Sequence, residues 1–266
     1  LIEEEIAKER QQIKTLEAQL ADIKHREEVL SNLITYIKKE WPQHIVSLFK
    51  KESPTLKKMG DENISLKDAL ESVQSLSEEN ARAIKEKFPA FLDDACKSHN
   101  LPLDRESRDP RYTFEKGFFT LEIDYQKGMA RLSDYEGNLD EFPCDIEAIV
   151  ESVQKEHKRI FGIKFDERKF LKKLRHQYLA ILKKERWPDG YAVPIRRITS
   201  RLGKNEKGFR TDSFIVQLSR LVEKGPFEIN NRSLDLQQTK DSHQGIYLHG
   251  LAGRGYVGYI TFKEVK

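Results

Sequence analysis

The sequence of 266 residues is poor in cysteine and contains no long apolar run. Its two cysteines, Cys96 and Cys144, exclude a disulfide-stapled scaffold and predict a reducing, intracellular compartment, which is cytoplasmic or, in a eukaryote, nuclear. No stretch approaches the roughly 18 consecutive apolar residues of a membrane span, so we expect no transmembrane segment. No basic segment followed by an apolar one opens the chain, so nothing indicates secretion.

Signatures of catalysis and of metal binding are also scarce. Cys96 and His99 have the spacing of a ligand pair, but a structural zinc site needs four ligands and no second close pair follows. A metal-dependent nuclease needs a carboxylate and a lysine two residues apart on one strand, and the polar residues of the predicted sheet lack that spacing: Glu115, Glu122, Asp124 and Lys127. We therefore expect a non-catalytic protein with no cofactor, no metal and no evident small-molecule substrate.

What the sequence has in abundance is charge, and the charge is unevenly distributed. Charged residues make up 34% of the chain, above the roughly 25% of an average globular protein, which favours long solvated helices. The net charge of +3 hides a basic end: residues 164–266 hold 22 Lys and Arg against 11 Asp and Glu, while residues 1–163 carry a net −8. This asymmetry indicates an anionic partner such as nucleic acid. The alternatives are two solvated surfaces of unlike sign, or an acidic arm docked on the basic half of a neighbouring subunit.

Residues 1–41 follow a heptad repeat without glycine or proline until Pro42. Apolar residues occupy nine of the eleven core positions, and Glu9 and Glu27 occupy the other two. This pattern predicts a coiled coil within residues 1–51, which either self-associates or binds a partner protein. Pro42 can stand in a new first helical turn, so we expect the helix to bend there and to end near Lys51. Because the chain opens at Leu1 without a methionine or a capping residue, we expect the natural helix to begin earlier.

The middle of the chain changes from helical to strand periodicity. Residues 52–110 predict a helical linker region with loops at 53–54 and 60–63, and with short helices opened by Ser65 and Ser77. Residues 111–163 predict a small domain. An antiparallel sheet forms its first part, up to residue 142, and is followed by a helix whose N-cap is Asp145.

The basic residues 164–266 predict a third kind of arrangement. A helix opened by Asp166 precedes a short extended piece, a helix from Pro194 to Gly203, and a helix that ends at Gly225. Strands are predicted at 246–249 and 257–262. In this order residues 168–262 resemble the winged-helix superfamily, although the turn after Gly203 and the stretch after Gly225 are long. The predicted fold class is thus α+β: a long N-terminal coiled-coil helix, a small antiparallel sheet with a helix, and a C-terminal winged-helix-like domain.

The resemblance implies contact with duplex DNA. The outward face of the last helix would carry Ser213, Gln217 and Arg220 into the major groove, and Arg254 in the glycine-rich loop would reach a minor groove. Basic residues of the preceding helix and turn would neutralise phosphates: Arg196, Arg197, Arg201, Lys204, Lys207 and Arg210. The alternatives are a winged helix used as a protein–protein adaptor, or an accessory subunit of an enzyme whose catalytic chain lies elsewhere.

Overall fold

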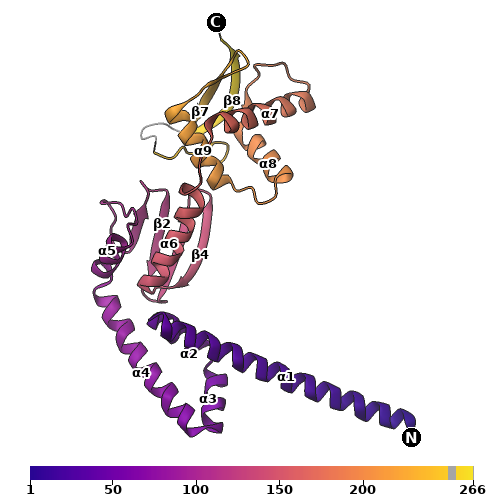
Figure 1. Ribbon diagram of the computed structural model, residues 1–266, viewed down its shortest axis with the longest axis vertical. Helices are drawn as coiled ribbons and strands as arrows, with labels where there is room; N and C mark the ends of the chain where they lie inside the picture. The colour runs from indigo at the N-terminus through magenta and orange to yellow at the C-terminus, as the bar shows by residue number, and fades with distance from the viewer. Residues whose placement is uncertain (251–255, 266) are drawn as a thin grey trace. The chain divides into compact units, whose positions relative to one another are not determined.

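The structure is a computed structural model that describes residues 1–250 and 256–265. It has the predicted α+β class, with a long N-terminal helix and small antiparallel sheets (Figure 1). The chain forms two compact units. The first comprises Leu1–Leu101, Glu122–Arg131 and Glu141–Glu151, and the second comprises Pro102–Leu121, Leu132–Asp140 and Ser152–Lys266. Over the described ranges, no helix has both the length and the apolar character that crossing a bilayer requires.

Five helices build most of the first unit: α1 (Ile2–Lys38), α2 (Pro42–Lys51), α3 (Ser53–Glu62), α4 (Ile64–Glu86) and α5 (Phe88–Ser98). Proline opens α2, as predicted, because its missing N–H is not needed in a first helical turn. The core of this unit joins the second half of α1 to α2, α3 and α4 through the buried side chains of Val29, Leu33, Ile45, Leu56 and Leu70.

The loops predicted at 53–54 and 60–63 are wrong, because both lie in or directly after α3. Pro54 occupies the first turn of that helix, where it breaks no hydrogen bond. Gly60 is buried where α3 meets α4, and a Cβ there would lie 3.3 Å from the Cβ of Lys67. The predicted break at Ser77 is also wrong: α4 is continuous, Ser77 is buried within it, and its cap is the Asn63 side chain, which accepts from Leu66 N at 3.1 Å.

The predicted heptad seam of α1 is exposed. Seven of its apolar residues are between 43% and 62% exposed: Ile6, Ile13, Leu16, Leu20, Ile23, Ile34 and Ile37. The residues that α1 buries within its own unit, Val29 and Leu33, belong to neither core position of the heptad. Helix α1 therefore has two apolar faces, one packed inside the chain and one open.

The first sheet has the strand order β1-β2-β3-β4, made of β1 (Arg111–Phe114), β2 (Phe119–Asp124), β3 (Met129–Asp134) and β4 (Gly137–Pro143). Burial alternates along β2, as the sequence pattern predicts. Helix α6 (Ile146–Phe161) follows.

Asp145 directly precedes α6, as predicted, and its main-chain oxygen accepts from Ile149 N at 3.0 Å, but its side chain binds a different helix. Its two carboxylate oxygens accept from the backbone N–H groups of Gln43 and His44, both at 2.8 Å, in the first turn of α2. One of them also lies 2.6 Å from His44 Nδ1. The carboxylate thus caps a helix about a hundred residues away, where the N–H groups of the first turn lack intrahelical partners.

The second unit contains α7 (Glu167–Glu185), β5 (Val193–Pro194), α8 (Ile195–Asn205), α9 (Thr211–Lys224), β6 (Glu228–Ile229), β7 (Arg232–Thr239) and β8 (Tyr256–Glu264). Its sheet has the order β5-β8-β7-β6. The predicted cap is confirmed, since the Asp166 side chain accepts from Lys169 N at 2.9 Å. The three helices bury Leu174, Tyr178, Ile198 and Leu218 together with Phe262 of the sheet.

The predicted strand at 246–249 is wrong. The antiparallel partner of β8 is β7, in a register that sets Leu234 beside Phe262 and Leu236 beside Ile260. Ile246 forms only an isolated bridge to Val257. Strand β7 was not predicted, because only two leucines alternate with its polar residues. This signal is weaker than the aromatic and β-branched residues of β8.

Candidate nucleic-acid interface

A basic groove of about 420 Å³ runs between α7 and α8 in the second unit. Five of its lining side chains are cationic: Lys184, Arg196, Arg197, Arg201 and Lys204. Glu185 is its only acidic lining residue. The groove therefore unites four of the predicted phosphate contacts, and it adds Lys184 from α7, which the prediction did not include.

Three of these arginines have partners within the chain but remain accessible. Arg196 forms an ion pair with Glu136 at 2.8 Å and keeps 36% of its side chain exposed. Arg197 lies 3.2 Å from Glu185, with 47% of its side chain exposed. Arg201 donates from Nε to the Gln177 side-chain oxygen at 2.9 Å, which leaves its terminal amino groups unused by that bond. Lys184 and Lys204 are both exposed.

The turn between α8 and α9 carries two further predicted contacts. Lys207 is exposed there. Arg210 is 48% exposed and forms an ion pair with the buried Asp212 at 3.0 Å. Arg254 lies outside the described residues.

The polar face of α9 contacts the C-terminal half of α6, which belongs to the same unit. Arg159 of α6 donates to Asp212 at 2.6 Å and to the Ser213 hydroxyl at 3.3 Å. Arg220 donates to the main-chain oxygen atoms of Phe161 at 2.9 Å and Ile163 at 3.3 Å. Gln217 is half-buried. Two of the three predicted base-reading side chains of α9 are thus engaged within the chain.

The pKa values of two neighbouring carboxyl groups at this contact, Asp134 and Asp212, are shifted in opposite directions. Burial, together with the negative charge of Asp212, raises the pKa of Asp134 to about 6. Burial opposes ionisation of Asp212 as well, but hydrogen bonds and charge from Arg159 outweigh it and hold the pKa of Asp212 below its usual range. Asp134 Oδ2 is buried with no hydrogen-bond donor facing it, while Oδ1 accepts from the N–H groups of Glu136 and Gly137. Below about pH 6 Asp134 is protonated and the pair carries a single negative charge beside Arg159, whereas at higher pH both carboxyl groups are ionised.

Neither thiol has the lowered pKa that makes a cysteine reactive. Burial raises the pKa of Cys96 to about 12 and that of Cys144 to about 11, so both stay protonated at neutral pH. Within residues 1–250 and 256–265, no group of three or more His, Cys, Asp and Glu side chains could hold a metal ion.

Comparison of the chain with protein-family models, with curated proteins and with solved structures found no match. We therefore infer function from the geometry and charge of the described residues. The signal that points to the groove in the sequence is the basic outer face of α7, which carries Lys183 and Lys184 opposite its apolar residues.

Proposed function

We propose that the protein is a non-catalytic nucleic-acid-binding protein or subunit whose α7–α8 groove contacts the phosphates of duplex DNA. The observation that carries this proposal is the convergence of five cations from two helices around a groove with one acidic residue. Phosphate contacts from Lys and Arg supply most of the affinity of sequence-independent binding.

The order and pairing of elements in the second unit support the interpretation of residues 168–262 as a winged-helix-like domain. Helix α7, strand β5, helices α8 and α9, and the β7–β8 pair follow the order of the superfamily, and β8 pairs with both β5 and β7. Strand β7 begins at Arg232, soon after Gly225, so the first strand of the hairpin follows α9 more closely than the sequence analysis predicts. Because α6 covers the polar face of α9, we propose contact with phosphates rather than base reading by that helix.

The exposed seam of α1 supports self-association through a parallel coiled coil. In the heptad register, Glu5 of one chain faces Arg10 of a second copy, and none of the corresponding flanking pairs along the helix brings like charges together. Glu9 and Glu27 lie in the core, where each faces its own copy in a parallel dimer, so both weaken the coiled coil. An exposed apolar stripe of this length favours a helical partner over water.

The decisive test measures fluorescence anisotropy of a labelled duplex with the full chain, at salt from about 50 mM to about 200 mM. We expect affinity to fall steeply with salt, and the variant Lys184→Glu with Lys204→Glu to lose at least about tenfold in affinity at low salt. The matched control is Lys172→Glu with Lys240→Glu, which makes the same change of net charge elsewhere on the second unit. Equal losses in both variants, or no binding by the unaltered chain, would reject the groove as the interface.

A protein–protein adaptor is the second candidate. The ion pairs of Arg196 with Glu136 and of Arg197 with Glu185 favour it, because they neutralise part of the basic surface within the chain. The absence of duplex binding at low salt would support this candidate over the first.

The seam is tested separately by light scattering. Leu16→Asp with Leu20→Asp places four charges in the core of a dimer and should lower the measured mass to that of one chain. Lys14→Asp on the outer face of α1 is the control. An unchanged mass in the seam variant, with an oligomeric parent, would assign the association to another surface.

A further inference from the structure

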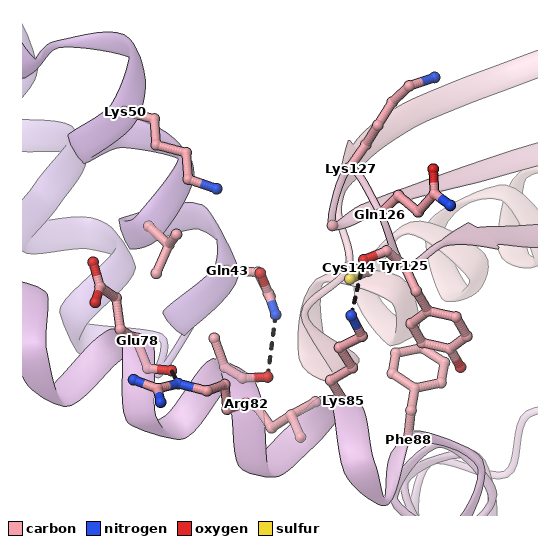
Figure 2. A pocket seen from close by; sticks show the side chains of 14 residues that line it. Gln43, Lys50, Glu78, Arg82, Lys85, Phe88, Tyr125, Gln126, Lys127 and Cys144 are labelled. Carbon is pink, nitrogen blue, oxygen red and sulfur yellow. Dashed lines mark hydrogen bonds between the residues drawn. The ribbon is translucent and has the colours of Figure 1, made fainter.

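The first unit contains a second cationic pocket, which the proposed function does not use. It measures about 420 Å³ and lies between α2, α4 and the turn that joins β2 to β3 (Figure 2). Four lining side chains are cationic: Lys50 from α2, Arg82 and Lys85 from α4, and Lys127 from the turn. Glu78 is the only carboxylate that lines it.

This concentration of positive charge lies in a unit whose net charge is negative. The first unit as a whole carries 18 Lys and Arg against 25 Asp and Glu. Four cations in one pocket of an acidic unit repel one another, and that repulsion is relieved when an anion enters between them.

The internal contacts of these cations leave most of their charge available. Lys85 Nζ donates to the main-chain oxygen of Tyr125 at 3.2 Å, which is a neutral acceptor. Arg82 Nε donates to the main-chain oxygen of Glu78 at 3.4 Å, so that bond uses neither terminal amino group of the guanidinium. Lys127 lies 3.2 Å from Asp124 and is largely exposed. Lys50 and Lys127 stand on opposite sides of the pocket in Figure 2.

The wall of the pocket is shaped by close packing. The Gln43 side-chain amide donates to the main-chain oxygen of Ala81 at 3.3 Å, which fixes it against α4. Gly128, at a positive φ of 67°, lies so near that a Cβ there would sit 3.2 Å from Gln43 Oε1. Phe88 and Tyr125 pack edge to face, with ring centroids 5.7 Å apart, and add apolar surface. The pocket is therefore a formed concavity with cationic and apolar walls.

We propose that this pocket binds a nucleotide-sized polyanion that carries at least two phosphate groups. Its volume falls in the range of small-molecule sites, roughly 300–1,000 Å³. Cations reach it from three separate elements, so a single phosphate would meet only part of them, whereas a chain of phosphates spans them. The guanidinium of Arg82 offers the forked geometry that phosphate oxygens accept.

The test is isothermal titration of the full chain with inorganic pyrophosphate and, separately, with ATP. Both should bind, and ATP should bind more tightly because its nucleoside contacts the apolar wall. Lys50→Gln with Arg82→Gln should weaken both at least about tenfold. Arg10→Gln with Lys14→Gln, two exposed positions on α1, removes the same charge outside the pocket and should leave affinity unchanged.

Two further variants keep the outcome decisive. Glu78→Gln removes the only carboxylate that lines the pocket and should tighten ATP binding by about two- to fivefold, a gain that no loss of folding can imitate. The groove variant Lys184→Glu with Lys204→Glu should bind ATP as the parent does. The proposal is overturned if neither ligand binds, if pyrophosphate binds but ATP does not, or if the groove variant loses ATP binding instead.

Discussion

Helices α8 and α9 lie in the same unit and carry similar cationic side chains, but they use them differently. The cations of α8 line a groove open to solvent, and their partners leave them about one-third to one-half exposed. The polar side chains of α9 instead hold the end of α6 through Arg220 and Asp212. Positive charge on a helix surface therefore identifies a ligand site only after the partners of each side chain within the chain are known.

The largest expected effect concerns Asp212, which is 3% exposed and forms ion pairs with Arg159 and Arg210. Asp212→Ala should lower the free energy of unfolding by about 2–4 kcal/mol, because the half-buried Arg159 then keeps only Glu156 as an acidic partner and Arg210 loses its ion pair. Urea denaturation followed by circular dichroism measures this. Arg210→Gln, at a side chain 48% exposed, should cost less than about 1 kcal/mol. Similar losses for the two variants would show that the contact of α6 with α9 is not stabilising.

A pair of single variants tests whether α8 and α9 have truly separate roles. Arg220→Gln removes hydrogen bonds to two main-chain oxygen atoms and should cost about 1–2 kcal/mol of stability, with duplex affinity nearly unchanged. Lys204→Gln should do the reverse: weaker duplex binding, with stability changed by less than about 0.5 kcal/mol. Each removes one positive charge, so net charge cannot explain a crossed result. A loss of duplex affinity in both would mean that α9 also faces the nucleic acid.

The smallest expected effect concerns Asp134, whose pKa of about 6 lies above its unfolded value. Between about pH 4 and pH 6 the folded state holds more protons than the unfolded state, so this group lowers stability as the pH rises through that window. Asp134→Asn should therefore raise the free energy of unfolding by about 1 kcal/mol at pH 8, and this advantage should vanish near pH 4. An advantage that persists at pH 4 would show that charge is not its cause.

Local signals in the sequence predicted much of the fold. The start of α2 at Pro42, the Asp166 cap of α7, the first sheet and the end of α9 at Gly225 all depend on residues close to each other in the chain. Breaker residues misled the prediction of α3, because a proline in a first turn and a glycine at a helix crossing are compatible with a helix.

Features fixed by distant residues could not be predicted in the same way. No sequence pattern links Asp145 to the first turn of α2, or Arg159 to Asp212. The pocket beside Arg82 likewise combines three segments whose cations look like ordinary surface charges in the sequence. For the candidate interface, periodicity located the cations on the helices, but only the fold separated those of α8 from those of α9.

The interleaved boundaries of the two units have a consequence for dissecting the protein. The backbone passes between the units several times within residues 101–152, so no single cut releases either unit whole. A fragment that ends at Leu101 would lack Asp145, whose carboxylate binds the first turn of α2. A fragment that begins at Lys164 would lack Arg159, which forms an ion pair with Asp212. Truncation would thus remove contacts that stabilise each half in the intact chain, and point substitutions in the intact chain are the better means to study each half.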